Sequence, residues 1–182
     1  PLKGLHRLLA VLQHVPATSW RLTVLGSQDR DRAYVGRMRR HIATMGWQEQ
    51  VQFHGLRSQT EVAICLADND VLAVPSYPES YSIAYLEALS QGLPVVTHAE
   101  SDSADLIEHG VSGFHMQPDD LASAAQHLEA LARDRAWLAR MSLAARSRFA
   151  GLPTWEQSVS CAAQFLEDVA AQRSPAAWFE RS

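Results

Sequence analysis

Two glutamates eight positions apart, Glu79 and Glu87, are the residues of this chain whose type and spacing most clearly suggest chemistry. They lie in PSYPESYSIAYLEALSQG, at residues 75–92, where an apolar run leads through a short loop into an expected helix. A helix N-terminus presents unpaired amide N–H groups and the positive end of the helix dipole, so it favours an anionic group. A carboxylate on that helix needs a donor or water, and sugar hydroxyls are suitable donors. The alternative is a solvated loop glutamate and a surface glutamate.

The elements that must position these residues alternate between short apolar strands and helices. Strands are expected at residues 20–26, 51–53, 70–74, 94–97 and 113–116, and helices at residues 4–14, 32–45, 59–67, 82–91, 103–108, 121–132, 135–149 and 155–172. This alternation indicates an α/β fold of the Rossmann-like, doubly wound kind, with a parallel sheet covered on both faces and extra C-terminal helices. Ligands of such folds bind outside the carboxyl ends of the strands. Gly26, Gly55, Pro75 and residues 97–103 fall at those ends.

Length and composition favour one domain, with a core over about residues 1–131 and a helical extension over about residues 132–182. The chain has 182 residues, of which 47% are apolar, and a net charge of −4 without a long basic run. These values exclude the electrostatic footprint of a nucleic-acid-binding protein. No apolar run approaches the ~20 residues that span a bilayer. Because the first residues already read as a helix start, we expect a strand to precede them in a longer protein.

The cysteines, histidines and serines of the chain give little indication of a disulfide, a metal site or a nucleophilic serine. Cys65 and Cys161 lie in apolar helical patterns, and we expect buried free thiols, which suit a reducing cytosol. The eight histidines form no HxH or HExxH pair, and His109 and His115 lie six positions apart across a glycine turn, so we expect no metal site. A GxSxG motif is absent, and Ser112 precedes a strand, which argues against a serine hydrolase.

Taken with its flanks, the glutamate segment resembles the signature of the group 1 family of retaining glycosyltransferases: Glu-x7-Glu followed by GLPVV at residues 92–96. Four further stretches resemble family motifs in family order. They are Lys3-Gly4 at the first helix, LTVLG at residues 22–26, VQFHG at residues 51–55 and HGVSGF at residues 109–114. Together these cover most of residues 1–131. The resemblance implies the two-domain GT-B fold, with this chain as the C-terminal, donor-binding half and the N-terminal acceptor domain absent from it.

The resemblance also implies roles for the charged residues. Glu87 would hydrogen-bond the ribose hydroxyls of a nucleotide, and Glu79, the catalytic candidate, would lie near the transferred sugar. Lys3 would contact the diphosphate, and a cation there offsets the repulsion from the carboxylates and stabilises the departing group. The family does not rely on a bound metal in this domain, so no metal or other cofactor is expected. The partners expected are a nucleotide-sugar donor and the protein's own N-terminal domain.

Backbone groups complete the implied donor site. The amides expected to face the diphosphate belong to Ser80, Tyr81, Ser82 and Ile83. Gly26 would let the backbone approach the donor, although a simple turn glycine is an equal alternative there. The turn at Leu56 would lie beside the base. Ser80 and Ser82 stand where the family usually has glycine, and Ser101 and Asp102 replace a frequent Gly-Gly pair, so donor preference and the strength of the donor site stay open.

The full enzyme implied by this resemblance transfers a sugar from a nucleotide diphosphate to an acceptor hydroxyl, with retention of anomeric configuration. We expect the chain alone to bind nucleotide but not to catalyse transfer. The alternative is a non-catalytic nucleotide-sugar-binding or interaction module with a degenerate donor site; an epimerase or a phosphorylase on the same fold is a weaker one. The expected location is the cytoplasm, with peripheral association at the inner face of a membrane as an option that depends on the other domain.

Overall fold

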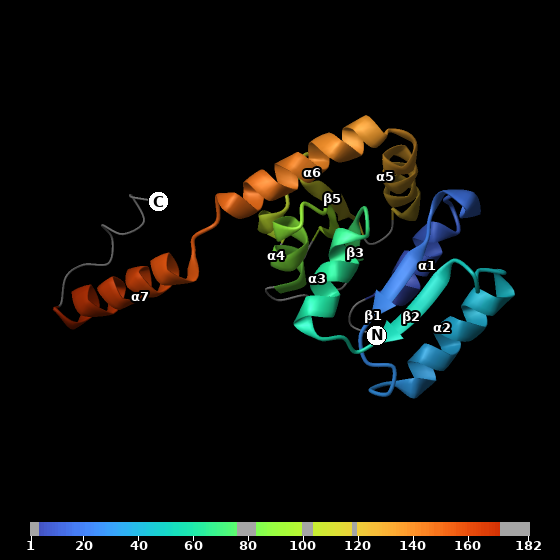
Figure 1. The fold of residues 1–182 in the computed structure, drawn as a ribbon, viewed down its shortest axis with the longest axis horizontal. Coiled ribbons are helices and arrows are strands. Elements are labelled where there is room, and N and C mark those ends of the chain that lie inside the picture. Colours follow the sequence, from blue (N-terminus) through green and yellow to red (C-terminus); the bar gives the residue numbers. More distant parts are fainter. Residues whose placement is uncertain (1–3, 76–82, 100–103, 118–119, 172–182) are drawn as a thin grey trace. The chain divides into compact units, whose positions relative to one another are not determined.

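The computed structural model describes residues 4–75, 83–99, 104–117 and 120–171, and the chain divides into two units, residues 1–150 and 151–182 (Figure 1). The first unit contains the strands β1 (Leu22–Leu25), β2 (Val51–Gly55), β3 (Leu72–Val74), β4 (Val95–His98) and β5 (Gly113–Met116). Its helices are α1 (Leu5–Leu12), α2 (Arg32–Thr44), α3 (Gln59–Ala67), α4 (Ile83–Ser90), α5 (Leu121–Arg133) and α6 (Arg135–Ala150), with short 3-10 helices at Ala17–Ser19 and Ala104–Leu106. The second unit contains α7 (Trp155–Ala170).

All strand pairs of the described chain are parallel, as the alternation of strands and helices predicts. β1 pairs with β2, with Leu22 opposite Val51, and β4 lies between β3 and β5. The expected α/β class is therefore confirmed. The expected single sheet, however, is two sheets in the described residues, one of two strands and one of three. The gap falls between β1 and β3, and within the described residues neither strand has a hydrogen-bonded neighbour on its second edge.

Local signals in the sequence set several helix ends. The Asp31 carboxylate accepts the N–H of Tyr34 at 2.9 Å and caps α2, which ends before Gly46 in a left-handed conformation at φ 71°. α3 begins with a capping box, in which the Ser58 hydroxyl and the Glu61 carboxylate each accept a backbone N–H of the other residue. The expected bounds of α3 are confirmed without change, because both partners lie within three residues of each other.

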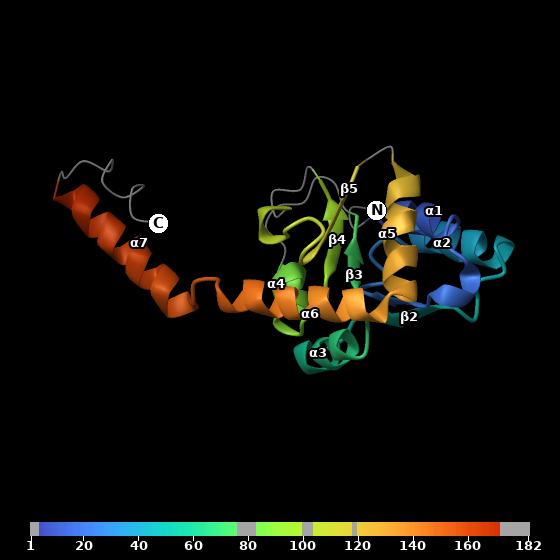
Figure 2. The same ribbon diagram turned by 90° about the horizontal axis from the view of Figure 1, so that it is seen from above.

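Two apolar clusters form the core of the first unit. In one, the leucines of α1 pack with residues of both sheets, including Val51 of β2, Val96 of β4 and Phe114 of β5. In the other, Tyr85 and Leu89 of α4 pack with residues of α3, β4 and α6. α6 runs along α4 in both views (Figures 1 and 2). These contacts hold α4, and with it the Glu87 position, against the three-stranded sheet.

Two sequence expectations are wrong. The helix expected at residues 103–108 is only a three-residue 3-10 helix, Ala104–Leu106. The Glu108 N–H donates to the Ser112 hydroxyl and the Glu108 carbonyl accepts the Ser112 N–H, both at 2.9 Å. A turn into β5 therefore uses the N–H that a helix extending to residue 108 would need. The thiols are not buried: Cys65 is half-buried, and Cys161 is exposed on α7, which has no buried residue.

No helix in the described part of the chain combines the length and the apolar character needed to cross a bilayer.

Candidate functional site

Helix α4 begins at the carboxyl ends of β3 and β4, and a buried tyrosine holds it there. The Tyr85 hydroxyl lies 2.5 Å from Thr97 Oγ1 and 3.5 Å from the Val74 carbonyl oxygen. Val74 ends β3, Thr97 is the next-to-last residue of β4, and the Tyr85 side chain is fully buried. Tyr85 belongs to the first turn of α4, so the positive end of this helix faces the sheet edge at which ligands of parallel α/β folds bind.

Glu87 lies one helical turn after Ile83 on α4, and the two residues therefore share a face of the helix. Ile83 is 68% exposed, whereas Glu87 is half-buried. The Ser90 hydroxyl donates to the Glu87 main-chain carbonyl at 2.7 Å. Within residues 4–75, 83–99, 104–117 and 120–171, no hydrogen bond or ion pair engages the Glu87 carboxylate. A half-buried carboxylate in this state can accept hydrogen bonds from a ligand, which is the chemistry expected of Glu87.

The second part of the site is the pair of turns that follow β1 and β2. The Gly26 N–H donates to the Gly55 carbonyl at 2.9 Å, so the two turns lie side by side. Gly26 has φ 130°, and a Cβ built on it meets no atom within 4 Å. Leu56, the next residue after Gly55, is 75% exposed. The backbone at Gly26 is therefore open to close approach, and Leu56 offers an uncovered apolar surface beside it.

The described structure thus brings the expected donor-site residues together in two pairs, Gly26 with Leu56 and Ile83 with Glu87, at the carboxyl ends of the strands. The remaining expected residues lie outside the described part of the chain: Lys3, Glu79, Ser80, Tyr81, Ser82, Ser101 and Asp102.

A cavity of about 390 Å³ at the carboxyl ends of β4 and β5 is lined by three histidines, His109, His115 and His127. The His115 N–H donates to His109 Nδ1 at 3.1 Å, so the neutral His109 ring carries its proton on Nε2. The His127 ring stacks on Phe114, with centroids 4.1 Å apart. Burial, and then repulsion from His109, lower the pKa of His127, which favours its neutral form.

In the described residues, no three side chains of His, Cys, Asp or Glu are arranged to hold a metal ion.

Sequence reasoning missed Tyr85 and the approach of His127 to His109. A tyrosine within the apolar pattern of α4 was a usable signal, because a buried phenol needs a hydrogen-bond partner. No pattern in the sequence indicated that His127 lies beside His109. The two residues are 18 positions apart along the chain, and they meet only because α5 packs on β5.

Comparisons with known proteins agree with this architecture. The family model described as glycosyl transferases group 1 matches residues 1–148. The glycogen synthase of Mycobacterium tuberculosis is 26% identical over 178 residues, which are 95% of this chain and 42% of that protein. The D-inositol 3-phosphate glycosyltransferase of Frankia alni is 30% identical over 158 residues, 83% of this chain and 39% of that protein.

Among solved structures, that of Anabaena Alr3699/HepE in complex with UDP-glucose superposes with a TM-score of 0.75 at 26% identity. The match covers 82% of this chain and 41% of the other. The chain therefore spans about two fifths of the length of these relatives. Since the family model covers far more than half of its residues, the chain belongs to the glycosyl transferases group 1 family.

Proposed function

We propose that this chain is the nucleotide-sugar-binding, C-terminal half of a retaining GT-B glycosyltransferase. In the longer parent protein, an N-terminal domain binds the acceptor. A sugar moves from its nucleotide diphosphate to an acceptor hydroxyl: the bond from the anomeric carbon to the diphosphate breaks, a bond to the acceptor oxygen forms on the same face, and the proton of the acceptor hydroxyl passes to the departing diphosphate. We expect this reaction in the cytoplasm.

The observation that carries the proposal is Glu87, a half-buried carboxylate on a helix whose first turn is fixed at the carboxyl ends of β3 and β4. A ribose presents two adjacent hydroxyls, both of which can donate to one carboxylate. The dipole of α4 favours the diphosphate at its N-terminus, ahead of Glu87 in the chain. A ligand in which a ribose is joined to a diphosphate therefore suits both the carboxylate of Glu87 and the positive N-terminal end of α4.

The remaining roles are proposed from the family pattern. The amides of residues 80–83 bind the diphosphate, and Lys3 supplies the positive charge that stabilises it as it departs. Glu79 lies near the transferred sugar and stabilises positive charge that develops on it. Gly26 admits the donor against the backbone, and Leu56 borders the base. Because Lys3 and the dipole of α4 offset the negative charge of the diphosphate, binding of the donor does not require a metal.

The test is a calorimetric titration of the chain with UDP, GDP, ADP and their common sugar conjugates. UDP comes first, because the Anabaena relative at 26% identity binds UDP-glucose. We expect one nucleotide to bind saturably, with equal affinity in EDTA. Glu87→Gln should weaken binding by about 1–3 kcal/mol, the scale of hydrogen bonds to a charged group.

The matched control is Glu49→Gln, which removes an exposed carboxylate from the turn before β2. This turn lies at the amino end of the strand, away from the carboxyl ends at which the donor is proposed to bind. This variant should leave the affinity unchanged. An equal affinity for the wild type and Glu87→Gln, in folded samples, contradicts the ribose role. Sugar transfer is assayed in the parent protein, since we expect the chain alone to be inactive.

A further inference from the structure

The turn between β1 and α2 carries a carboxamide, that of Gln28, close to the turn that follows β2. The Gln28 side chain is half-buried, and its Nε2 atom lies 3.5 Å from the position that a Cβ on Gly55 would occupy. Gly55 directly precedes Leu56, the exposed residue that borders the base in the proposed function. The amide of Gln28 therefore lies where a polar group could contact the edge of a nucleotide base.

Arg39 of α2 fixes the direction in which this amide points. Arg39 Nη2 donates to Gln28 Oε1 at 2.6 Å. A guanidinium has donors and no acceptor, so the amide oxygen must face Arg39 and the NH2 group must face the other way. In the part of the chain that the structure describes, no acceptor engages Gln28 Nε2. The amide therefore offers unused N–H donors on the side of Gly55.

The groups that hold the amide are themselves held in place. The Arg39 guanidinium lies over the ring of Phe53 in β2, 4.6 Å from the ring centroid. The Ser27 hydroxyl accepts two main-chain N–H groups of its own turn, both at 3.3 Å, and so shapes the backbone around Gln28. A side chain that is already fixed loses little conformational freedom when a ligand binds, which favours selection between similar ligands.

Nucleotide bases differ in the group that they could present to a fixed N–H donor. Uracil and guanine carry a carbonyl oxygen, O4 or O6, where cytosine and adenine carry an amino group. The carbonyl oxygen accepts a hydrogen bond from the amide, whereas an amino group faces it with hydrogens and leaves the donor unpaired. Small-molecule sites commonly combine an apolar wall with a few placed polar groups. Here Leu56 supplies the apolar surface, and Gln28 supplies the polar group.

We propose that Gln28 is a specificity-determining residue of the donor site, and that its amide donates a hydrogen bond to the carbonyl oxygen of uracil or guanine. Arg39 is the positioning residue that keeps the NH2 group turned toward the base. These roles rest on the proposed function, in which the base lies beside Leu56. The donor is then a nucleotide with a keto base: UDP binds more tightly than CDP, and GDP binds more tightly than ADP.

The test is a calorimetric titration of the chain with UDP, CDP, GDP and ADP. UDP and CDP share the ribose and the diphosphate and differ only in the substituent on C4 and the proton on N3, so the ratio of their affinities isolates contacts with the base. We expect a ratio of about ten in favour of UDP, the scale of one hydrogen bond and one unpaired donor. GDP should be favoured over ADP to a similar degree.

Gln28→Glu tests the specificity role directly. The substitution places an acceptor oxygen where Nε2 lies, and the carboxylate keeps its contact with Arg39 as an ion pair. The ratio of UDP to CDP affinity should therefore fall at least about tenfold, because UDP loses a donor and CDP gains an acceptor.

Two substitutions of Arg39 test the positioning role. Arg39→Met removes the donor to Gln28 Oε1, so the amide can turn over, and the affinities for UDP and CDP should approach each other. Arg39→Lys keeps a donor for Oε1 and should retain most of the preference for UDP. A purely structural role of Arg39 would change both affinities together and leave their ratio as it is in the wild type.

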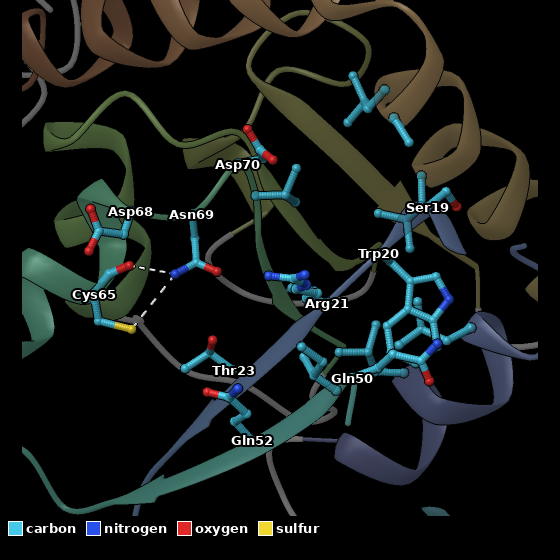
Figure 3. A pocket seen from close by; sticks show the side chains of 18 of the residues that line it. Ser19, Trp20, Arg21, Thr23, Gln50, Gln52, Cys65, Asp68, Asn69 and Asp70 are labelled. Atoms are coloured by element: carbon cyan, nitrogen blue, oxygen red, sulfur yellow. Dashed lines mark hydrogen bonds between the residues drawn. The ribbon is translucent and has the colours of Figure 1, made fainter. Parts of the chain in front are cut away.

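The matched control is Gln52→Glu, the same substitution on the opposite face of the two-stranded sheet. Gln52 precedes Phe53 on β2, so its side chain points away from Arg39. It lines the cleft of about 1140 Å³ between β1 and β3, where Figure 3 shows it beside Thr23, its partner in the strand register. Gln52→Glu should leave the ratio of UDP to CDP affinity unchanged.

The possible outcomes separate this role from the nucleotide site as a whole. Saturable binding with the same ratio in the wild type and Gln28→Glu overturns the role of Gln28 alone, as does a wild-type preference for CDP over UDP or for ADP over GDP. An equal change of the ratio in Gln52→Glu shows that added charge is the cause and overturns it as well. If a folded sample binds none of the four nucleotides, the proposed function itself is contradicted, and the role of Gln28 with it.

Discussion

The hydroxyl of Tyr85 lies 2.5 Å from Thr97 Oγ1, and this contact ties the first turn of α4 to the end of β4. Both side chains are fully buried. One proton arrangement satisfies both residues: Thr97 donates to Tyr85, and Tyr85 donates to the Val74 carbonyl oxygen at 3.5 Å. The helix that carries Glu87 is thus located by a polar chain in the core as well as by apolar packing.

Tyr85→Phe should lower the free energy of unfolding by about 1–3 kcal/mol, because it leaves the Thr97 hydroxyl buried without a partner. Thr97→Val should cost a similar amount. The double variant should be less destabilised than the sum of the single variants, because it removes both polar groups together. Urea unfolding of the four proteins measures the coupling, and strictly additive effects would show that the two hydroxyls do not act as a pair.

Gly4→Ala should destabilise the protein by about 2–5 kcal/mol, the sum of the cost of a left-handed backbone and the cost of overpacking. Gly4 has φ 72°, and its added Cβ would meet the Pro75 carbonyl oxygen. Gly46→Ala is the matched control, because Gly46 has φ 71° but open space around its Cβ position. Its expected cost is only about 1–2 kcal/mol. Equal losses in chemical denaturation would show that α1 does not press against the end of β3.

Gly26→Ala should reduce donor affinity about tenfold or more, a change of at least ~1.4 kcal/mol, because the new methyl group occupies the space that the donor needs. The methyl group meets no protein atom, so the cost to stability is that of the backbone at φ 130° alone, about 1–3 kcal/mol. The matched control is Gly110→Ala, because Gly110 has φ 78° and equally open space around its Cβ position but precedes β5, at the amino end of that strand. This variant should leave the affinity unchanged. Calorimetric titration of both folded variants decides this prediction, and equal affinities would exclude close approach of the donor at Gly26.

The free energy of unfolding should fall as the pH drops below 6.5, the ordinary pKa of histidine. Burial, followed by repulsion from His109, lowers the pKa of His127 in the folded protein, so the unfolded chain binds the proton more readily. Between the lowered pKa and 6.5 the unfolded state carries more protons, and stability therefore rises with pH in this window. His127→Gln should flatten part of this dependence in urea titrations. The remainder should come from His6, whose pKa is lowered by burial and by Arg7; an unchanged profile in His127→Gln would contradict the assignment.

Short-range patterns in the sequence were enough to predict most elements of the first unit. α3 has its expected bounds because its capping box joins residues three positions apart, and Gly46 ends α2 because a left-handed residue there favours glycine. The α/β class followed from the alternation of such elements. The helix expected at residues 103–108 does not form over that range, because the Ser112 hydroxyl, from the following turn, accepts the N–H of Glu108.

The sequence by itself therefore determined the elements, the family and the residues proposed to bind the donor, since each depends on residue types at fixed local spacing. Only the tertiary structure decided that Tyr85 bonds to Thr97, that His127 meets His109, and that β1 and β3 leave a cleft between them. These relationships join residues from different elements. They depend on how strands and helices pack in three dimensions, and the spacing of residues along the chain carries no record of that packing.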